Sequence, residues 1–523
     1  MRIQETGGVR DRGEIIKGTD MNSGETKHSR KNEYDSTSCK RQVETEDALP
    51  VGLTHITREA QETERREGVS RDTQSLEETF AILRDGAWTE TKLRLITQRG
   101  KEIPKYKFTS LAYLLNEGFL EQCFKDLSKN KACGIDGVTV KEYEANLGGN
   151  LKDLVNRMKT LRYYPQPVKR VNIPKANGKT RPLGISTIED KIVQLGIKRV
   201  LEAIFEGDFC DSSYGFRPNR SCHDALDALD KTIMMKPVNV IVDMDIEQFY
   251  DSIDRKWLME CLKQRINDTG LLRLIARFLR AGIIEEGKHY EVDKGTVQGD
   301  IMSPVLSNIY LHFVLNLWFE KVAQKQLKGF SKLVTYADDF VVCYESRESA
   351  EQFIEMLKER FAKFGLKISE SKSRVIDFGR KALDKATREG GKVATFDFLG
   401  FTHFCDKTRK GKFKLGRKTS ERKFRQKMVA INDWLKKIRN CIKQTEWWEV
   451  FRMKLAGHYR YYGISGNMRA LRKFHYLTSE LAYKWLNRRS QKRSLSHSQF
   501  TRYLKSTLPV PKIYHLTYAL SSF

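Results

Sequence analysis

The stretch that decides the fold is KLVTYADDFVVCY, residues 332–344. Two short runs of apolar and β-branched residues flank a pair of acidic residues, Asp338 and Asp339. This pattern predicts a strand, a tight turn and a second strand, with both carboxylates at the tip of the hairpin. Because Asp is common in turns, a polar turn without further function explains this stretch, taken alone, about as well as a cation-binding site does.

A second stretch, VNVIVDMDIEQFYD at residues 238–251, is another strand that ends in carboxylates, and an aromatic pair follows it. If the two elements lie side by side in one sheet, Asp245 meets Asp338 and Asp339. Three carboxylates at one point can hold two Mg²⁺ ions, because Mg²⁺ prefers oxygen ligands. Two such ions roughly 3.5–4 Å apart activate a 3′-hydroxyl and stabilise a leaving pyrophosphate. Together the two stretches predict the chemistry of a nucleotide polymerase.

The charge of the chain indicates a polyanionic partner. The 523 residues carry a formal net charge of +27, and residues 405–523 alone hold 29 Lys and Arg against 6 Asp and Glu. Such an excess repels itself unless a polyanion neutralises it, so nucleic acid is the expected partner. An acidic membrane surface is the alternative, but no amphipathic anchor segment stands out. A chain of this length predicts two to four domains.

Cysteine usage and hydropathy indicate the compartment. The nine cysteines are scattered without a Cys-x-x-Cys pair, which argues against a zinc site or a disulfide framework and favours a reducing compartment. No apolar run approaches the ~20 residues of a membrane span, and no signal peptide is apparent. We therefore expect no membrane association and a cytoplasmic location, in a bacterium, with an organelle as the alternative.

Residues 1–75 are polar and poor in aromatic residues. They cannot bury enough apolar surface to offset the entropy of ordering, so we expect a disordered leader, with a partner-binding arm as the less favoured alternative. From Lys407 onward the sequence is basic and its pattern is helical. Aromatic residues are interleaved with Lys and Arg there, and core packing is their more common role.

Two further motifs suit a nucleotide. In IPKANGKTRPLGI, residues 173–185, the Asn-Gly pair predicts a hairpin that places Lys175 and Arg181 on paired strands. Both could reach one triphosphate, although this motif taken alone slightly favours a solvated basic hairpin. In GTVQGDIMSP, residues 295–304, Gln298 lies in the loop before a long apolar helix. Backbone and amide donors in such a loop suit a nucleotide or a base pair.

In their order along the chain, these motifs resemble those of the reverse transcriptase–maturases encoded by group II introns, from about Phe108 to Ile513. The motifs that carry the resemblance are residues 131–138, 173–185, 213–221, 243–254, 295–311, 336–340, 365–375 and 398–402. In the C-terminal part, KLAGHYRYYGISGN at 454–467 and WLNRRSQKRS at 485–494 are similar to the maturase (thumb) domain of that family.

The resemblance implies an α+β fold of the right-hand polymerase class. It implies fingers at 76–235, a palm with an antiparallel sheet at 236–403, and a basic α-helical thumb, or maturase domain, at 404–523. The implied metal ligands are Asp245, Asp338, Asp339 and the carbonyl of Ile246. The implied nucleotide-binding residues are Lys175 and Arg181 at the triphosphate, Phe249 under the sugar, Gln298 in the pocket and Lys372 near the pyrophosphate. Tyr250 is the other candidate for the sugar gate, and spacing does not separate it from Phe249.

The function implied is that of an RNA-directed DNA polymerase that copies intron RNA with two Mg²⁺ ions. The same resemblance implies a maturase that binds its host group II intron RNA to assist splicing and mobility. The expected partners are that RNA, an RNA template with a DNA primer, dNTPs and target DNA. The alternatives are a non-catalytic splicing cofactor, a domesticated or antiphage-defence reverse transcriptase and, more distantly, a viral RNA-dependent RNA polymerase.

The sequence departs from the family pattern in two places. Val297 and Asp300 stand where Pro and Gly are common in the family. Asp300 either alters metal or nucleotide affinity through its charge or caps the helix that follows. No Cys/His cluster follows the thumb, so we expect no HNH-type endonuclease, and second-strand cleavage is then absent or supplied by the host.

Overall fold

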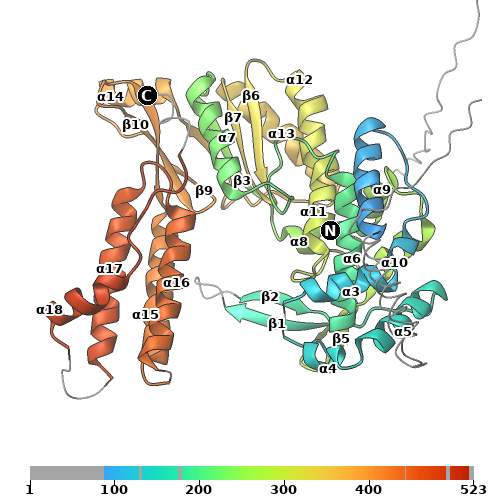
Figure 1. The fold of residues 1–523 in the computed structure, drawn as a ribbon. Helices are drawn as coiled ribbons and strands as arrows, with labels where there is room; N and C mark the ends of the chain where they lie inside the picture. Colours follow the sequence, from blue (N-terminus) through green and yellow to red (C-terminus); the bar gives the residue numbers. More distant parts are fainter. Residues whose placement is uncertain (1–87, 129–131, 175–179, 442, 490–494, 517–523) are drawn as a thin grey trace, which may run out of the picture. The chain divides into compact units, whose positions relative to one another are not determined.

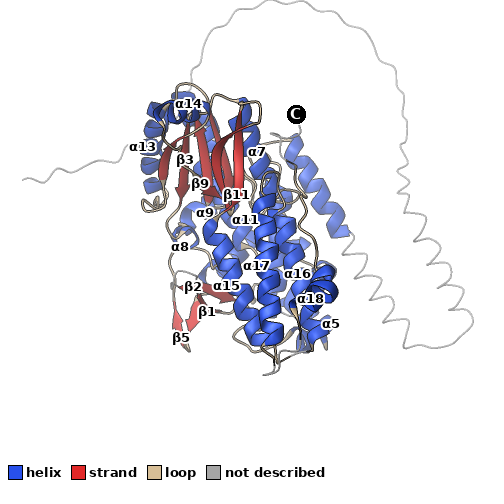
Figure 2. Cartoon of the chain, turned by 90° about the vertical axis from the view of Figure 1, so that its left-hand side faces the viewer, coloured by secondary structure: helices blue, strands red, loops and turns tan. Residues whose placement is uncertain are grey.

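The computed structural model describes residues 88–128, 132–174, 180–441, 443–489 and 495–516. The chain divides into two compact units, residues 1–71 and 72–523, and every described residue belongs to the second. The described residues form a mixture of helices and sheets (Figures 1 and 2), which confirms the predicted α+β class. The predicted leader at 1–75, Lys175 and the Asn-Gly pair of the basic hairpin lie outside the described residues.

The N-terminal part of this unit is mostly helical. A helix over 88–102 precedes a 3₁₀ turn (η1, Ala112–Leu114), α3 (Glu117–Asp126), α4 (Val140–Glu144), α5 (Leu147–Lys159), α6 (Ile188–Phe205) and α7 (Cys222–Met235). Between α5 and α6, β1 (Val168–Pro174) pairs antiparallel with β2 (Thr180–Ile185), as the hairpin pattern predicts. β1 also pairs with β4 (Ile283–Glu285), which pairs with β5 (Lys288–Tyr290), so this sheet has the order β2-β1-β4-β5.

A four-stranded antiparallel sheet forms the centre of the unit. It has the order β6-β7-β3-β8, with β3 at Val240–Asp245, β6 at Ser331–Tyr336, β7 at Asp339–Tyr344 and β8 at Arg374–Asp377. Alternate residues of a strand face opposite sides. Val242 packs in the cluster that includes α13 (Arg347–Lys363), and Ile241 packs in the cluster that includes α7. The sheet is therefore buried on both faces, with one of these helices on each (Figure 2).

Two sets of helices lie between β3 and β6, and α13 connects β7 to β8. α8 (Phe249–Ser252), α9 (Arg255–Lys263) and α10 (Thr269–Arg280) follow β3. The predicted long apolar helix is α11 (Ser303–Leu311), which continues through two π-helical turns, η2 (His312–Asn316) and η3 (Phe319–Ala323), into α12 (Gln324–Gln326). α14 (Arg380–Glu389) follows β8.

The C-terminal part begins with a hairpin. β9 (Phe396–Phe398), β10 (Phe401–Lys407) and β11 (Phe413–Thr419) form a three-stranded antiparallel sheet. The prediction of helix from Lys407 onward is therefore wrong for residues 407–419. Gly411, with φ 76°, closes the turn between β10 and β11, and Phe401 and Leu415 bury one side of the hairpin. The helices are α15 (Glu421–Ile438), α16 (Gln444–Tyr462), α17 (Met468–Asn487), α18 (His497–Gln499), η4 (Phe500–Leu504) and η5 (Lys505–Thr507).

Among the residues that the structure describes, no helix is at once long and apolar enough to cross a bilayer.

Candidate active site

The two acidic stretches of the sequence meet at one end of the central sheet. Asp245 is the last residue of β3, and its Cα partner across the ladder is Asp339, the first residue of β7. Asp338 lies in the turn between β6 and β7, after Ala337, whose φ of 55° makes the turn tight. The predicted juxtaposition of the three acidic residues is therefore present in the fold.

The tip of this hairpin is supported by the loop of residues 211–221. The Ser212 carbonyl accepts the Thr335 N–H at 2.8 Å, and the Thr335 carbonyl accepts the Tyr214 N–H at 3.0 Å. A Cβ added to Gly215 would come within 2.4 Å of the Ala337 nitrogen, so only glycine allows the loop to pack this closely. The loop thus holds the carboxylate turn in place. The Phe216 ring is half exposed, and its centre lies 6.2 Å from the centre of the Tyr336 ring.

Burial and mutual repulsion raise the pKa values of the clustered carboxyls. The pKa of Asp339 rises to about 7, first because of burial and then because Asp243, Asp338 and Asp245 are close. Burial, followed by the charge of Asp245, also raises the pKa of Asp338. Neighbouring carboxylates attract cations, and carboxylate oxygens are the ligands that hard divalent ions such as Mg²⁺ prefer.

Two cationic side chains of the protein already contact the cluster. The Lys372 ammonium forms an ion pair with Asp245, and Arg374 bonds to Asp243 at 2.9 Å. Across the residues that the structure describes, no three His, Cys, Asp or Glu side chains converge closely enough to hold a metal ion. In this arrangement Lys372 neutralises part of the charge that a metal ion would otherwise balance. The structure thus places Lys372 beside the carboxylates, and its expected place near the pyrophosphate stays a prediction.

The Ile246 carbonyl is turned toward the hairpin tip. Ile246 forms an antiparallel bridge with Ile368, in which Asp245 accepts the Ser369 N–H at 2.8 Å and Lys367 accepts the Glu247 N–H at 2.9 Å. In such a pair the central residue directs its own N–H and C=O away from the partner strand. That direction is the side on which β7 lies, so the carbonyl is suitably aimed for a metal ligand.

Arg181 is close to the acidic cluster. It is an exposed residue of β2, opposite Ile173, and its positive charge lowers the pKa of Asp338 and of Tyr250 against the larger effect of burial. Gln298 lies in the loop before α11, and its carbonyl accepts the Gly184 N–H from β2 at 2.7 Å. The loop also reaches α8, because the Tyr250 carbonyl accepts the Thr296 N–H at 2.8 Å. The hairpin, this loop and α8 therefore form one assembly.

Phe249 and Tyr250 lie in different surroundings. Phe249 is 2% exposed and packs in the core, whereas Tyr250 is only partly buried. Burial, and then the charge of Asp338, raises the pKa of Tyr250 to about 12. Gln248 has a φ of 44°, so the chain turns sharply before α8, and the two rings meet edge to face with their centroids 5.6 Å apart. Of the two candidates, Tyr250 is the one beside the carboxylates.

The Asp300 side chain is buried and forms hydrogen bonds inside the fold. Its carboxylate accepts the hydroxyl of Ser186 and bonds to Gln194, and burial raises its pKa to about 6. α11 begins at Ser303 with Met302 as its N-cap residue, so the prediction that Asp300 caps that helix is wrong. The carboxylate instead ties the Gln298 loop to α6.

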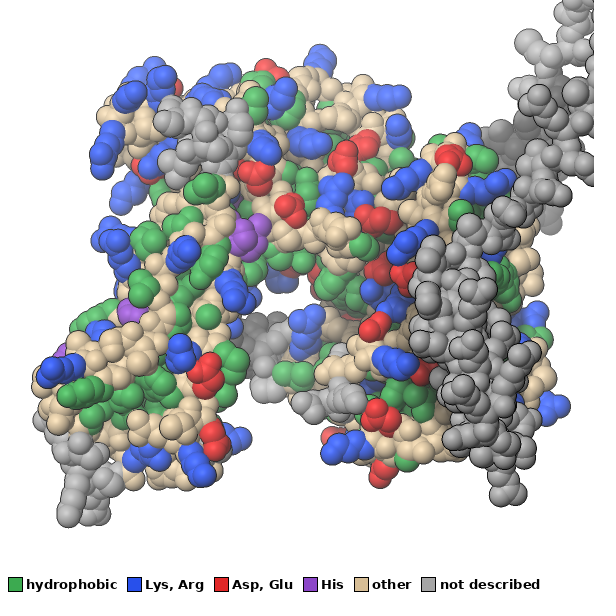
Figure 3. Space-filling model, in the orientation of Figure 1, with side chains coloured by type: hydrophobic (Ala, Val, Ile, Leu, Met, Phe, Trp, Pro, Cys, Tyr) green, Lys and Arg blue, Asp and Glu red, His purple; other side chains and the backbone are tan. Residues whose placement is uncertain are grey.

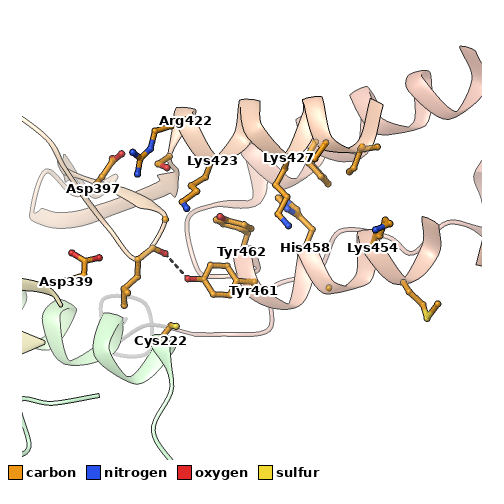
Figure 4. Close-up of a pocket in the computed structure, with 18 of the residues that line it drawn as sticks. Cys222, Asp339, Asp397, Arg422, Lys423, Lys427, Lys454, His458, Tyr461 and Tyr462 are labelled. Carbon is orange, nitrogen blue, oxygen red and sulfur yellow. Dashed lines mark hydrogen bonds between the residues drawn. The ribbon is translucent and has the colours of Figure 1, made fainter. Parts of the chain in front are cut away.

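The structure also places residues near the carboxylates that the sequence motifs did not single out. A pocket of about 770 Å³ runs from Asp339 and Asp397 along α15 and α16 (Figure 4). We call it the cationic pocket, because Arg422, Lys423, Lys427 and Lys454 line it. Within the described part of the chain, no carboxylate forms a salt bridge with these four side chains. The sequence does hold a signal for this face, because residues four apart lie on the same side of a helix. Lys423 and Lys427 have this spacing on α15, and Lys454 and His458 have it on α16.

His458 has an unusual position at the wall of the cationic pocket. It is 6% exposed, its ring stacks on Phe474 at 3.6 Å, and neither ring nitrogen has a partner among the described residues. Burial, and then the charge of Lys427, lowers the pKa of His458 to about 3, so the imidazole is neutral. The Tyr461 hydroxyl donates to the Leu399 carbonyl at 2.8 Å and ties α16 to the β9–β10 turn (Figure 4).

Comparison with known proteins identifies the central region. Residues 173–403 match the reverse transcriptase (RNA-dependent DNA polymerase) family. The group II intron-encoded protein LtrA of Lactococcus lactis is 38% identical over 233 residues, which are 43% of this chain and 38% of LtrA. Protein YkfC of Escherichia coli is 36% identical over 186 residues, 34% of this chain and 48% of YkfC. A 91 kDa protein in the cob intron of Schizosaccharomyces pombe is 33% identical over 233 residues, 43% of this chain and 29% of that protein.

These matches confirm the predicted resemblance to intron-encoded reverse transcriptase–maturases. The matched region spans less than half of the length of each of these three relatives.

Proposed function

We propose that this chain copies RNA into DNA at the carboxylate end of the central sheet, with Asp245, Asp338 and Asp339 as the catalytic residues. The observation that carries the proposal is the pairing of Asp245 with Asp339, next to Asp338, within a region that matches reverse transcriptases. We propose with it the right-hand arrangement, with fingers at 76–235, a palm at 236–403 and a thumb at 404–523.

Reverse transcriptases use divalent metal ions, and the oxygen donors here suit two Mg²⁺ ions. Asp245, Asp338, Asp339 and the Ile246 carbonyl would hold them. When bound, the ions supply activation of the primer 3′-hydroxyl and stabilisation of the leaving pyrophosphate. Lys372, which pairs with Asp245 in the free protein, would exchange that carboxylate for the phosphates of the nucleotide.

The remaining groups position the nucleotide. Arg181, exposed beside Asp338, would bind the triphosphate as a planar fork, and Lys175 would add a second charge. The Tyr250 ring, beside the same carboxylate, is better placed than the buried Phe249 to lie against the sugar and reject a 2′-hydroxyl. Gln298, fixed between β2 and α8, would contact the base or the sugar of the incoming nucleotide.

The cationic pocket would hold the primer–template duplex. Its four cations, which form no salt bridge with any described carboxylate, suit backbone phosphates, and it begins at Asp339, where the primer end must lie. A neutral His458 can donate a hydrogen bond to a phosphate or sugar oxygen without adding charge. Contacts of this kind orient a duplex without reading its sequence.

We further propose that the basic C-terminal helices bind the host group II intron RNA and assist its splicing. The support is the charge of residues 405–523 and the similarity to intron-encoded proteins. Target DNA would be a further substrate in intron mobility. An inert scaffold that serves only as a splicing cofactor would have no need for an acidic triad flanked by Arg181 and Lys372.

Primer extension on an RNA template tests the polymerase proposal. Asp338→Asn should lower the rate of dNTP incorporation by at least about a thousandfold, because electrostatic stabilisation at such a centre is worth several kcal/mol. Glu359→Gln, which removes one negative charge from an exposed position of α13, is the matched control and should leave the rate unchanged. Full extension by Asp338→Asn would show that the catalytic assignment is wrong and would favour the non-catalytic alternative.

A further inference from the structure

A second basic surface lies at the end of the central sheet away from the carboxylates. β3 and β8 run antiparallel, and Asp377, the last residue of β8, lies opposite Val240, the first residue of β3. Asp245 is at the other end of β3, about five residues or ~17 Å from this pair. α14 starts at the Asp377 end. The turn of residues 408–412, between β10 and β11, lies beside it.

α14 is fixed to β10 by specific bonds. The Gly379 N–H donates to the Cys405 sulfur at 3.3 Å, and the Cys405 thiol donates to the Gly379 carbonyl at 3.7 Å. The Lys407 ammonium donates to the Thr387 hydroxyl at 3.1 Å, and the Arg380 guanidinium lies 5.3 Å from the centre of the Phe413 ring. The helix and the hairpin therefore present one continuous surface.

This surface is strongly cationic. We call it the distal basic patch and define it by eight exposed side chains: Lys381, Lys385, Arg388, Lys392, Lys407, Arg409, Lys410 and Lys412. Lys and Arg side chains gather over α14 and the neighbouring end of β10, at the upper left of Figure 3. The exposed acidic residues of α14 are Asp384 and Glu389, and Asp406 is already paired with Lys414 at 2.9 Å.

Fold stability does not explain these charges. α14 has no buried residue, so its cations do not support a packed core. Like charges this close repel one another unless an anion neutralises them. Membrane binding fits poorly, because no large apolar side chain between residues 380 and 414 is exposed, and an interfacial element needs such side chains.

We propose that the distal basic patch binds the phosphodiester backbone of a nucleic acid segment outside the catalytic site. The inference rests on the proposed function only in taking nucleic acid as the polyanion. Because the patch and Asp245 are at opposite ends of the sheet, a strand on the patch would not compete with a primer–template duplex in the cationic pocket. The patch would hold a distant part of a long template, or a second molecule, while synthesis proceeds.

The test compares two quadruple variants of the full chain. Lys385→Ala, Arg388→Ala, Arg409→Ala and Lys410→Ala together remove four charges. The charge-conserving control exchanges Lys and Arg at the same four positions. All four side chains are exposed, so both variants should keep the thermal stability of the wild type.

Binding is measured with a long structured RNA, a long DNA duplex and vesicles of anionic lipid, and primer extension with a short RNA–DNA duplex. The alanine variant should bind long RNA, long DNA or both at least about tenfold more weakly at moderate salt, with a salt slope lower by roughly 3 to 4. Comparing the loss of affinity for long RNA with the loss for long DNA shows which of the two backbones the patch prefers. The exchange variant should match the wild type, and extension of the short duplex should be unchanged in both variants.

Unchanged affinity for both long probes would overturn the inference. An equal loss on the short duplex would also overturn it, because the patch would then belong to the catalytic path, and so would a loss confined to the vesicles. The two proposals fail separately. A wild-type chain that binds long RNA through the patch but extends no primer would refute the polymerase proposal alone.

Discussion

A buried ion pair joins the C-terminal hairpin to the central part of the fold. Arg417 of β11 bonds to Asp230 of α7 at 2.7 Å, and the two side chains are 1% and 0% exposed. The Arg417 guanidinium also donates to the Leu226 carbonyl at 3.3 Å. Burial lowers the pKa of Arg417, and the charge of Asp230 opposes that effect. This pair helps to fix β11 against the central part of the fold. It thereby also helps to position α15 and the cationic pocket relative to the central sheet.

Asp230→Ala should therefore lower the free energy of unfolding by much more than the loss of one contact would. The guanidinium stays buried without a counter-charge, which typically destabilises a protein by about 3–5 kcal/mol. Asp230→Leu with Arg417→Met replaces the pair by apolar groups of similar volume, and such exchanges are often nearly neutral. The double variant should recover most of the loss.

Urea unfolding followed by tryptophan fluorescence measures this effect, because Trp434, Trp447, Trp448 and Trp485 all lie in the C-terminal helices. Glu421→Ala breaks the exposed pair with Arg425 and should barely move the midpoint. A loss below about 1 kcal/mol for Asp230→Ala, or a double variant as unstable as the single one, would refute the reasoning.

Three further predictions concern the site. The pKa of Asp339 is raised from 3.8 to about 7, so its ionisation costs stability as pH rises through that window, by at most about 4 kcal/mol. In EDTA, Asp339→Asn should therefore match the wild type near pH 4 and exceed it above pH 7, and a pH-independent difference between their unfolding midpoints would contradict this. Tyr250→Ala should raise the incorporation of ribonucleotides relative to deoxyribonucleotides, whereas Phe249→Ala should leave that ratio alone and lower stability by about 3–5 kcal/mol; the opposite pattern would make Phe249 the gate. Asp300→Ala leaves buried donors unpaired and should cost about 1–3 kcal/mol in unfolding free energy, with the dNTP KM unchanged; an altered KM would point to a role in nucleotide binding.

The sequence was informative where local pattern decides the structure. The alternation of apolar residues around Asp338 and the run that ends at Asp245 specify strands, and carboxylates at strand ends meet when the strands pair. The antiparallel partner of Asp245 is therefore the expected one. Hairpin chemistry likewise predicted the pairing of β1 with β2 that places Arg181.

The sequence was uninformative where the structure depends on distant contacts. Phe249 and Tyr250 are consecutive residues of α8 that differ in burial, which spacing does not reveal. Asp300 resembled a cap because it precedes a helix, yet its partners are Ser186, just before α6, and Gln194 within α6. The cationic pocket combines residues from 222 to 474, and no motif connects them. The hairpin at 401–419 was hidden because its outer side is as basic as the helices after it.

The central claim is that three acidic residues act as one catalytic unit. The most direct test is single-turnover primer extension on RNA with Asp245→Asn, Asp339→Asn and the double variant. Groups that act together lose their effect together, so each single variant should lose at least about a thousandfold and the double variant little more. Substantial extension by either single variant, or losses that multiply in the double variant, would contradict the claim.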